Sequence, residues 1–271
     1  MLTINKKTIG VIGAGAMGSA LIAGFLKAGL VQPGDVTVSD PQEDTLEVLK
    51  KDFAVNVSTA NQDAVLHSGV VILAVKPSLV AGVLKEIAHL ITPQQLVISV
   101  AAGVQIVSLE RDLPMGIPVI RVMPNVPALI SEGMTALALG SSAADVHREA
   151  AEELFSAVGR VITLKERDLD AVTGVSGCGP AYMAVILEAL ADGGVKMGLS
   201  RQVALELAVQ TMIGTARMIQ LTGEHPAVLK DRVCSPGGST ISGVHVLENG
   251  GLRGLLISAV EAAAKRSGEL K

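Results

Sequence analysis

The sequence predicts an α/β protein with a doubly wound parallel sheet in residues 1–164 and an all-α domain in residues 165–271. Strand-like and helix-like segments alternate through the first part, and strand-like segments stop near residue 165. Composition is the third observation, because 49% of the 271 residues are hydrophobic and only 1% are aromatic. Strands buried on both faces of a parallel sheet are rich in aliphatic, β-branched residues, so this composition suits the predicted class.

The expected strands are short runs of aliphatic residues, mostly β-branched. They cover residues 8–12, 35–40, 70–75, 96–100, 118–122, 135–139 and 160–164. Between them, apolar residues at spacings of three and four, or polar helix-forming stretches, predict helices at 17–26, 42–51, 78–91, 104–112 and 143–157. Because strand and helix alternate, the connections are expected to be crossovers between parallel strands.

Four helices are expected after the charged stretch 165–168, at 180–197, 200–222, about 238–249 and 252–268. The helix at 200–222 carries apolar residues around much of its circumference, which is typical of a helix buried by several partners. A region this short has little interior in which to bury such a helix. We therefore expect another subunit to cover it.

Charge and cysteine content exclude several classes of protein. The 22 basic and 26 acidic residues give a net charge of −4 without a basic stripe, which argues against nucleic-acid binding. Cys178 and Cys234 cannot form a disulfide framework, and no cluster of residues suggests a metal site. The sequence shows no stretch of about 18 residues that is free of charged and polar breaks, so we expect no membrane span. Residues 1–7 are too short and polar for a signal peptide, and a cytoplasmic protein is expected.

A glycine-rich turn follows the first expected strand. It consists of Gly13, Ala14, Gly15, Ala16, Met17 and Gly18, and it matches G-x-G-x-x-G at the start of a helix. The first glycine permits the tight turn, the second allows close approach of a pyrophosphate, and the third allows the helix to pack on the strand. This context predicts a Rossmann-like dinucleotide-binding domain. A phosphate loop of the G-x-x-x-x-G-K-[ST] type is excluded, because Ser19 stands where lysine is required.

The choice between NAD and NADP stays open. Ser39 and Asp40 end the second strand, where the adenosine ribose binds in this architecture. Asp40 is suited to accept a hydrogen bond from a 2′-hydroxyl, whereas Ser39 is suited to donate one to a 2′-phosphate. Asp40 has a second interpretation as a turn residue before Pro41.

Three further loops follow the carboxyl ends of strands, where ligands bind in open α/β sheets. They are Ala74-Val75-Lys76-Pro77, Ala101-Ala102-Gly103 and the loop 123–127. Lys76 is either a cofactor contact or an ordinary solvated lysine. Asn125, between two prolines, is either a rigid turn residue or a positioned polar group.

The helical half contains two glycine–proline loops, at 174–180 and 235–240, and each is expected to precede a helix. A helix N-terminus presents unpaired N–H groups that bind anions such as carboxylates. Simple helix capping by Ser or Thr is the alternative interpretation.

Together these segments resemble the pyrroline-5-carboxylate reductase family over essentially the whole chain. The motifs in order are GAGAMG at 13–18, AVKP at 74–77, AAGV at 101–104, RVMPNVP at 121–127, SGCGPAY at 176–182, ADGGVKMGL at 191–199, SPGGSTISG at 235–243 and HVLENGG at 245–251. The resemblance implies reduction of 1-pyrroline-5-carboxylate to L-proline by NADPH or NADH, the last step of proline biosynthesis.

The resemblance also implies roles for individual residues. Besides the glycine-rich turn, cofactor-binding positions are matched by Ser39, Asn61, Lys76 with its loop, and Ala101 to Gly103. Positions around the substrate are matched by Glu166, Gly238, Ser239 and Thr240. The Thr240 hydroxyl is expected to hydrogen-bond the ring nitrogen as the catalytic contact, and backbone N–H groups to hold the carboxylate. Family members form homodimers through the helical domain, and these often assemble further into decamers.

The sequence departs from the family pattern at Cys178 (usually serine), at Ser239 (often threonine or alanine) and at Asp40, near which NADP-preferring members carry arginine or asparagine. One rival is a β-hydroxyacid-dehydrogenase-like oxidoreductase, which needs a lysine on the helix after the second glycine loop. Lys196 lies over four turns beyond that point. A second rival is a non-catalytic NAD(P)-binding sensor, against which the intact SPGGST loop argues.

Overall fold

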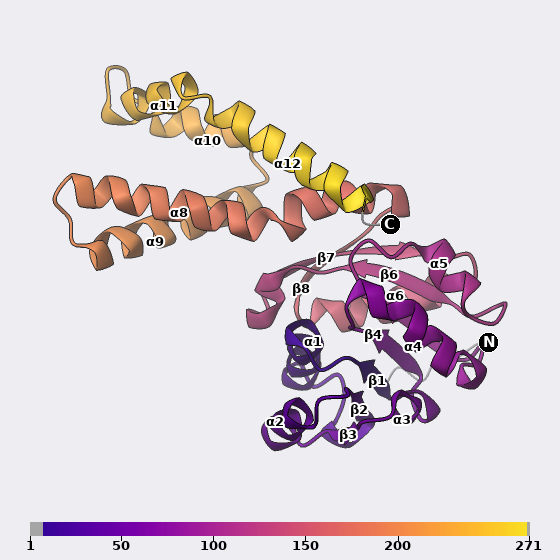
Figure 1. Cartoon of the computed structure of the whole chain (residues 1–271). Coiled ribbons are helices and arrows are strands. Elements are labelled where there is room, and N and C mark those ends of the chain that lie inside the picture. The colour runs from indigo at the N-terminus through magenta and orange to yellow at the C-terminus, as the bar shows by residue number, and fades with distance from the viewer. Residues whose placement is uncertain (1–7, 270–271) are drawn as a thin grey trace. The chain divides into compact units, whose positions relative to one another are not determined.

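The computed structural model describes residues 8–269, and its first part contains one eight-stranded sheet (Figure 1). The strand order is β3-β2-β1-β4-β5-β6-β7-β8. The strands are β1 (Ile9–Ile12), β2 (Val36–Ser39), β3 (Asn56–Ser58), β4 (Val70–Leu73), β5 (Leu96–Ser99), β6 (Val119–Met123), β7 (Gly133–Leu139) and β8 (Gly159–Thr163). Residues 1–7, which we expect not to form a signal peptide, lie outside the described part.

Six helices accompany the sheet, and the remaining helices follow it along the chain. The six are α1 (Ala16–Lys27), α2 (Glu43–Phe53), α3 (Asn61–Leu66), α4 (Val80–Ile87), α5 (Ile106–Arg111) and α6 (Asp145–Ser156). The later ones are α7 (Leu169–Val172), α8 (Gly179–Lys196), α9 (Arg201–Thr222), α10 (Pro226–Val233), α11 (Ser239–Asn249) and α12 (Leu252–Glu269). The predicted fold class is confirmed.

The central strands are buried on both faces, as their aliphatic composition predicts. Every residue of β1, β4 and β5 is buried. Val70 and Ile72 of β4 pack in the cluster that includes α1, α2 and α6, whereas Val71 and Leu73 pack in the cluster that includes α3, α4 and α5. Because successive side chains of a strand point to opposite faces, each strand contributes to both clusters. This arrangement makes the sheet doubly wound.

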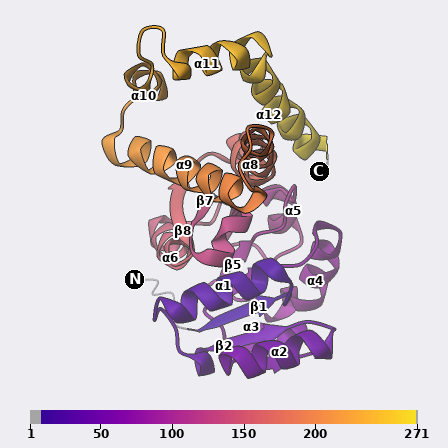
Figure 2. The same cartoon turned by 90° about the vertical axis from the view of Figure 1, so that its left-hand side faces the viewer.

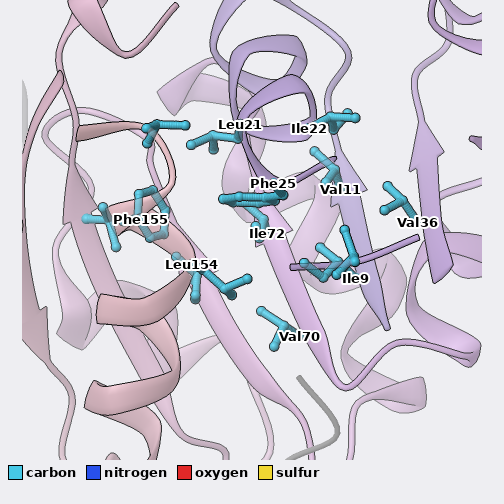
Figure 3. Packing of buried hydrophobic residues seen from close by; sticks show 14 of the residues in the cluster. Ile9, Val11, Leu21, Ile22, Phe25, Val36, Val70, Ile72, Leu154 and Phe155 are labelled. Atoms are coloured by element: carbon cyan, nitrogen blue, oxygen red, sulfur yellow. The ribbon is translucent and has the colours of Figure 1, made fainter. Parts of the chain in front are cut away.

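Helices α1 and α6 cover one face of the sheet and meet through two phenylalanines (Figure 3). Phe25 and Phe155 are fully buried, and their rings pack edge to face at 6.2 Å between centroids and 82° between planes. Such pairs add stability beyond the apolar area that they bury. A chain with only three phenylalanines places two of them at this helix–helix contact.

The structure differs from the expected pattern at two places in the sheet. Strand β7 runs antiparallel to β6, and β8 is parallel to β7, so the sheet is mixed at this edge. The reason is the short connection between β6 and β7, since parallel strands need a crossover of a dozen or more residues. Strand β3 and helix α3 were not predicted, because β3 is only 3 residues long and not buried, and therefore lacks an apolar run.

The predicted domain boundary lies between residues 164 and 165. By contacts, the described chain divides into one unit that ends at Gly177 and includes the chain again from Ala262, and a second unit of Cys178–Glu261. The end of α12 joins the first unit through the Ser267 hydroxyl, which donates to Asp170 Oδ1 at 2.9 Å.

The second unit is built around the helix pair α8 and α9 (Figure 1). Small residues permit the close approach: Ala191, Ala204 and Ala208 are buried, and a Cβ on Gly194 would lie 2.8 Å from the Ala204 Cβ. In Figures 1 and 2, α10 and α11 lie apart from this pair. Helix α10 was not predicted.

Large apolar side chains of the second unit remain exposed in the single chain. Leu221 of α9 is 71% exposed, Val246 of α11 is 67% exposed and Ile257 of α12 is 64% exposed. The chain itself therefore leaves these faces uncovered, as expected for the helix at 200–222.

The expectation that no segment has the properties of a membrane span is wrong. The helical stretch Glu166–Lys196 is 31 residues long and has a mean hydropathy of 1.3 over an 18-residue window, of which 11% is buried. Isolated polar residues in this stretch do not outweigh its small apolar residues. By length and composition alone, this is weak evidence for a membrane helix, because core helices pass the same test.

The packing of α1 against Val158, which follows α6, leads to a stability prediction. A Cβ on Gly24 would lie 2.2 Å from Cγ1 of the fully buried Val158. We expect Gly24→Ala to lower the free energy of unfolding by about 1–3 kcal/mol, because this packed side chain cannot move away. Gly82→Ala in α4 is the matched control, since its Cβ would meet nothing within 4 Å. It should stabilise by up to about 1 kcal/mol through helix propensity. Urea denaturation at one protein concentration measures both, and equal effects would contradict this packing.

Candidate active site

The glycine-rich turn joins β1 to α1, and two of its glycines are required by packing. Gly13 has a φ of +107°, and a Cβ there would lie 2.5 Å from the Ala74 carbonyl oxygen. A Cβ on Gly18 would lie 2.1 Å from the Gly13 carbonyl oxygen. A Cβ on Gly15 would meet nothing within 4 Å, and both Gly15 and Ala16 are exposed at the start of α1. The turn is therefore closed around Gly13 and Gly18, and it is open at Gly15, where a pyrophosphate would approach.

Asp40 holds this turn against the end of β2. Its Oδ2 accepts a hydrogen bond from the Ala14 N–H at 2.9 Å, and its Oδ1 accepts one from the Gln42 N–H at 2.9 Å. The second bond is the local one expected of a turn aspartate, so the interpretation as a turn residue describes its contacts in the structure. The bond to Ala14 adds a function that the sequence did not suggest, because it fixes the glycine-rich turn.

Ser39 and Asn61, both predicted cofactor residues, are in direct contact. The buried Ser39 hydroxyl donates to Asn61 Oδ1 at 3.0 Å, and Asn61 Nδ2 donates to Glu86 Oε2 at 2.8 Å. Ser39 is the last residue of β2, Asn61 is the first residue of α3, and Glu86 lies in α4. Sequence reasoning missed Glu86, because an exposed glutamate on a helix carries no motif.

Two of the predicted cofactor loops line one cavity. This cavity has a volume of about 410 Å³ and is bordered by Pro77 and Ser78 on one side and by residues 102–105 and Ser108 on the other. Lys76 is exposed immediately before Pro77, at the start of a 3₁₀ turn (Pro77–Leu79). The loops after β4 and β5 thus come together at the carboxyl end of the sheet, as their positions in the sequence predict.

Asn125 is a positioned polar group in the loop after β6. Its Oδ1 accepts from the Met134 N–H at 2.8 Å, and its Nδ2 donates to the Ser176 carbonyl at 3.2 Å and to the Ser176 hydroxyl at 3.1 Å. The side chain therefore joins the loop to β7 and to the turn that precedes α8.

Glu166 forms an ion pair with a buried arginine in the first unit. Its Oε1 accepts from the Ile106 N–H at 2.7 Å and from Arg121 Nη1 at 3.0 Å. Arg121 is only 4% exposed. Glu166 thus caps α5 and neutralises a buried cation, and the resemblance had implied only a substrate contact. Arg121 was not singled out, although an arginine inside an apolar strand signals a buried ionic partner.

The prediction of an open loop at 174–180 is wrong. Residues Thr173–Gly177 form a π-helical turn that continues α7, and α8 begins at Gly179. The Thr173 hydroxyl donates to the Leu169 carbonyl at 2.9 Å. Because the backbone is helical here, the segment is not an open loop with free N–H groups for an anion. Single π-helical turns of this kind often interrupt α-helices at functional positions.

The second expected loop is present before α11. Gly237 has a φ of +68°, the Gly238 N–H donates to the Ser235 carbonyl at 3.0 Å, and α11 begins at Ser239. The first N–H groups of a helix, here those of Ser239, Thr240 and Ile241, have no acceptor within the helix. No side chain caps this end. Thr240 is half-buried beside these groups, so backbone donors and a hydroxyl lie together on the second unit.

His147 and Tyr182 are two further titratable side chains whose pKa values are shifted. His147 is buried and accepts from the Ala144 N–H through Nδ1 at 2.9 Å, and burial lowers its pKa. Desolvation, with Cys178 nearby, raises the pKa of Tyr182, which disfavours proton donation by that phenol at neutral pH. Within residues 8–269, no group of three or more His, Cys, Asp or Glu side chains is arranged to hold a metal ion.

The doubly wound sheet, the glycine-rich turn and the loops at its carboxyl edge define a dinucleotide-binding protein of the Rossmann class. Residues 8–103 match a family profile described as NADP oxidoreductase, coenzyme F420-dependent, and residues 166–270 match one described as pyrroline-5-carboxylate reductase dimerisation. The chain belongs to the pyrroline-5-carboxylate reductase family.

Full-length relatives support this assignment. Pyrroline-5-carboxylate reductase of Methanosarcina acetivorans is 46% identical over 98% of this chain and 99% of its own. The Coxiella burnetii enzyme structure matches with a TM-score of 0.93 at 34% identity, over 98% of this chain and 99% of that one. The Plasmodium falciparum enzyme, solved with NADP bound, matches with a TM-score of 0.89 at 31% identity, over 99% of both chains. The resemblance drawn from the sequence motifs is confirmed, and the dimerisation profile fits a homo-oligomer.

The contacts of Glu166 lead to a second stability prediction. Glu166→Ala leaves the Arg121 cation and the Ile106 N–H without their acceptor, and we expect a loss of about 1–3 kcal/mol in the free energy of unfolding. Asp168→Ala is the control in the same 3₁₀ turn (Glu166–Asp168), because Asp168 is exposed and pairs with Arg167 only at 3.7 Å. It should change stability by less than about 0.5 kcal/mol. Thermal and urea unfolding compare the two, and a loss no larger for Glu166→Ala would refute the role of this contact.

Proposed function

We propose that this chain reduces 1-pyrroline-5-carboxylate to L-proline by hydride transfer from NADPH or NADH, the last step of proline biosynthesis. Full-length similarity to pyrroline-5-carboxylate reductases carries the proposal. The fold supports it, because it supplies both an open glycine-rich turn for a dinucleotide and an uncapped helix end for a carboxylate.

The first unit is proposed to hold the cofactor, which supplies the hydride when bound. The open backbone at Gly15 and Ala16 receives the pyrophosphate, aided by the N-terminus of α1. Ser39 and Asn61 lie where the adenosine ribose binds, and the loops at 74–77 and 101–103 face the rest of the dinucleotide. The residues of the glycine-rich turn that complete this set are Gly13, Ala14, Met17 and Gly18.

The N-terminus of α11 is proposed to hold the substrate. The N–H groups of Ser239 and Thr240, with Gly238 as the N-cap residue, bind the carboxylate of 1-pyrroline-5-carboxylate. The Thr240 hydroxyl hydrogen-bonds the ring nitrogen as that atom gains basicity during reduction. Glu166 is retained as a proposed substrate-side residue, held by its bonds to Arg121 and the Ile106 N–H.

The chain is proposed to act as a cytoplasmic homodimer through its helical domain, and these dimers are proposed to assemble further into a decamer. The exposed apolar side chains of α9, α11 and α12 support the dimer, because burying them against a second copy removes apolar surface from water. Neither nucleic acid nor a membrane is proposed as a partner. Both cysteines are free, which suits a reducing compartment.

Oxidation of NADH and NADPH in the presence of 1-pyrroline-5-carboxylate tests the proposed reaction, with proline measured as product. Proline formed in step with cofactor oxidation is the expected result. The same cofactors with 3-oxoacids test the β-hydroxyacid rival. Absence of proline with both cofactors would refute the proposal.

Substitution of Thr240 tests its role. We expect Thr240→Ala to lower kcat by about 10- to 1000-fold, as the loss of a positioned hydrogen-bond donor does elsewhere. Thr240→Ser is the matched variant, because it keeps the hydroxyl and should retain most of the turnover. Circular dichroism checks the fold of both. Wild-type turnover in the alanine variant would remove Thr240 from the mechanism.

A further inference from the structure

A carboxylate lies beside the pair of residues that marks the ribose end of the cofactor site. Ser39 at the end of β2 bonds Asn61 at 3.0 Å, and Asn61 bonds Glu86 at 2.8 Å. Glu86 belongs to none of the motifs in the sequence, and its exposed side chain comes from a different helix. NAD and NADP differ only in the 2′ group of the adenosine ribose. The residues that contact this group therefore decide which of the two cofactors a protein of this fold prefers.

The hydrogen bonds fix which polar atoms this position offers. The Ser39 hydroxyl has one hydrogen, and it is donated to Asn61. Asn61 has two amide hydrogens, and one of them is donated to Glu86. One amide hydrogen and the carboxylate acceptors of Glu86 therefore remain for a ligand. A 2′-hydroxyl both donates and accepts, so it satisfies both groups.

A 2′-phosphate is poorly matched to the same position. A 2′-phosphate carries about two negative charges and only accepts hydrogen bonds. At this position it would find one donor, the free amide hydrogen of Asn61, and it would be repelled by the negative charge of Glu86. The first arginine of the chain is Arg111, so the guanidinium clamp that commonly binds this phosphate is missing from the first 110 residues.

The neighbouring charges reinforce this mismatch. Asp40 follows Ser39 and brings a second carboxylate to the end of β2. Each of its two oxygens accepts a hydrogen bond from a backbone N–H group. Within residues 8–269, neither Asp40 nor Glu86 forms an ion pair with a lysine or arginine. Lys85 and Lys76, the lysines nearest to Glu86 in sequence, are exposed, so water screens their charge.

We propose that Glu86 determines cofactor preference in this chain and favours NADH over NADPH. Its carboxylate accepts a hydrogen bond from the Asn61 amide and repels a 2′-phosphate by its negative charge. Ser39 acts as a positioning residue, because it is fully buried and fixes the Asn61 amide instead of contacting the ligand. The proposal rests on the proposed function only in requiring that a dinucleotide binds at this edge of the sheet.

Equilibrium binding of NADH and NADPH without substrate tests the proposal, with nucleotide fluorescence as the readout. We expect the wild-type chain to bind NADH more tightly. Glu86→Gln keeps an acceptor for Asn61 but removes the charge, and it should tighten NADPH binding by about tenfold with little change for NADH. Glu86→Lys should reverse the preference.

The control is Glu149→Gln, which removes another exposed carboxylate, from α6, where it pairs with Arg148 only at 3.7 Å. It should leave the ratio of the two dissociation constants unchanged. Tighter wild-type binding of NADPH, or an unchanged ratio in both Glu86 variants, would overturn the proposal. Because binding is measured without substrate, failure to form proline would refute the proposed reaction alone and leave this test standing.

Discussion

The geometry of the cofactor side depends on one constraint, the parallel pairing of β1 with β2 on one side and with β4 on the other. The pairing places Ile12 level with Ser39 and with Leu73, so the three strands end in one row. The Gly13 N–H then donates to the Ser39 carbonyl at 2.8 Å, and the Ala74 N–H donates to the Ile12 carbonyl at 2.8 Å. A shift of one residue would turn every side chain of β1 to the other face, and a side chain in place of Gly10 would then clash with the Ala64 carbonyl of α3, so close packing holds this register.

Much of this unit could be predicted from the sequence, because its signals are local. The apolar run at 70–75 identifies a doubly buried strand, and the glycine-rich turn at 13–18 marks the first strand–helix junction. Given a parallel sheet, the loops after successive strands must gather at its carboxyl edge. The cavity between Pro77 and the loop at 102–105 follows from that rule.

The parts that were not predicted depend on contacts between distant residues. Glu166 meets Arg121 and the Ile106 N–H, 45 and 60 residues away along the chain, and no spacing rule connects them. Glu86 of α4 and Asn61 of α3 are 25 residues apart along the chain, and no spacing rule connects them either. The glycines and serine at 174–177 predict a loop, whereas the structure continues α7 through Thr173–Gly177 as a π-helical turn.

The helical half explains the composition of the chain. A mean hydropathy of +0.50 with almost no aromatic residues is accounted for in part by the buried strands. The rest lies on helices such as α9, where Leu207 is 55% exposed and Ile213 is 56% exposed in the single chain. The dimerisation profile over residues 166–270 fits a homo-oligomer, and we propose that a second copy of the chain covers these faces. The stretch at 166–196 has the hydropathy of a membrane helix because it, too, carries apolar surface that its own chain does not bury.

Gly15 provides the most direct measurement of the central claim, that a dinucleotide binds at the open end of the glycine-rich turn. Its φ of −68° suits any residue, and its Cβ would meet no protein atom within 4 Å. Gly15→Val should therefore leave the free energy of unfolding within about 1 kcal/mol of the wild type, the scale of a helix N-cap change. The same variant should bind NADH at least about tenfold more weakly, because the side chain occupies the path of the pyrophosphate. Unchanged affinity for NADH in a folded Gly15→Val protein would contradict the account.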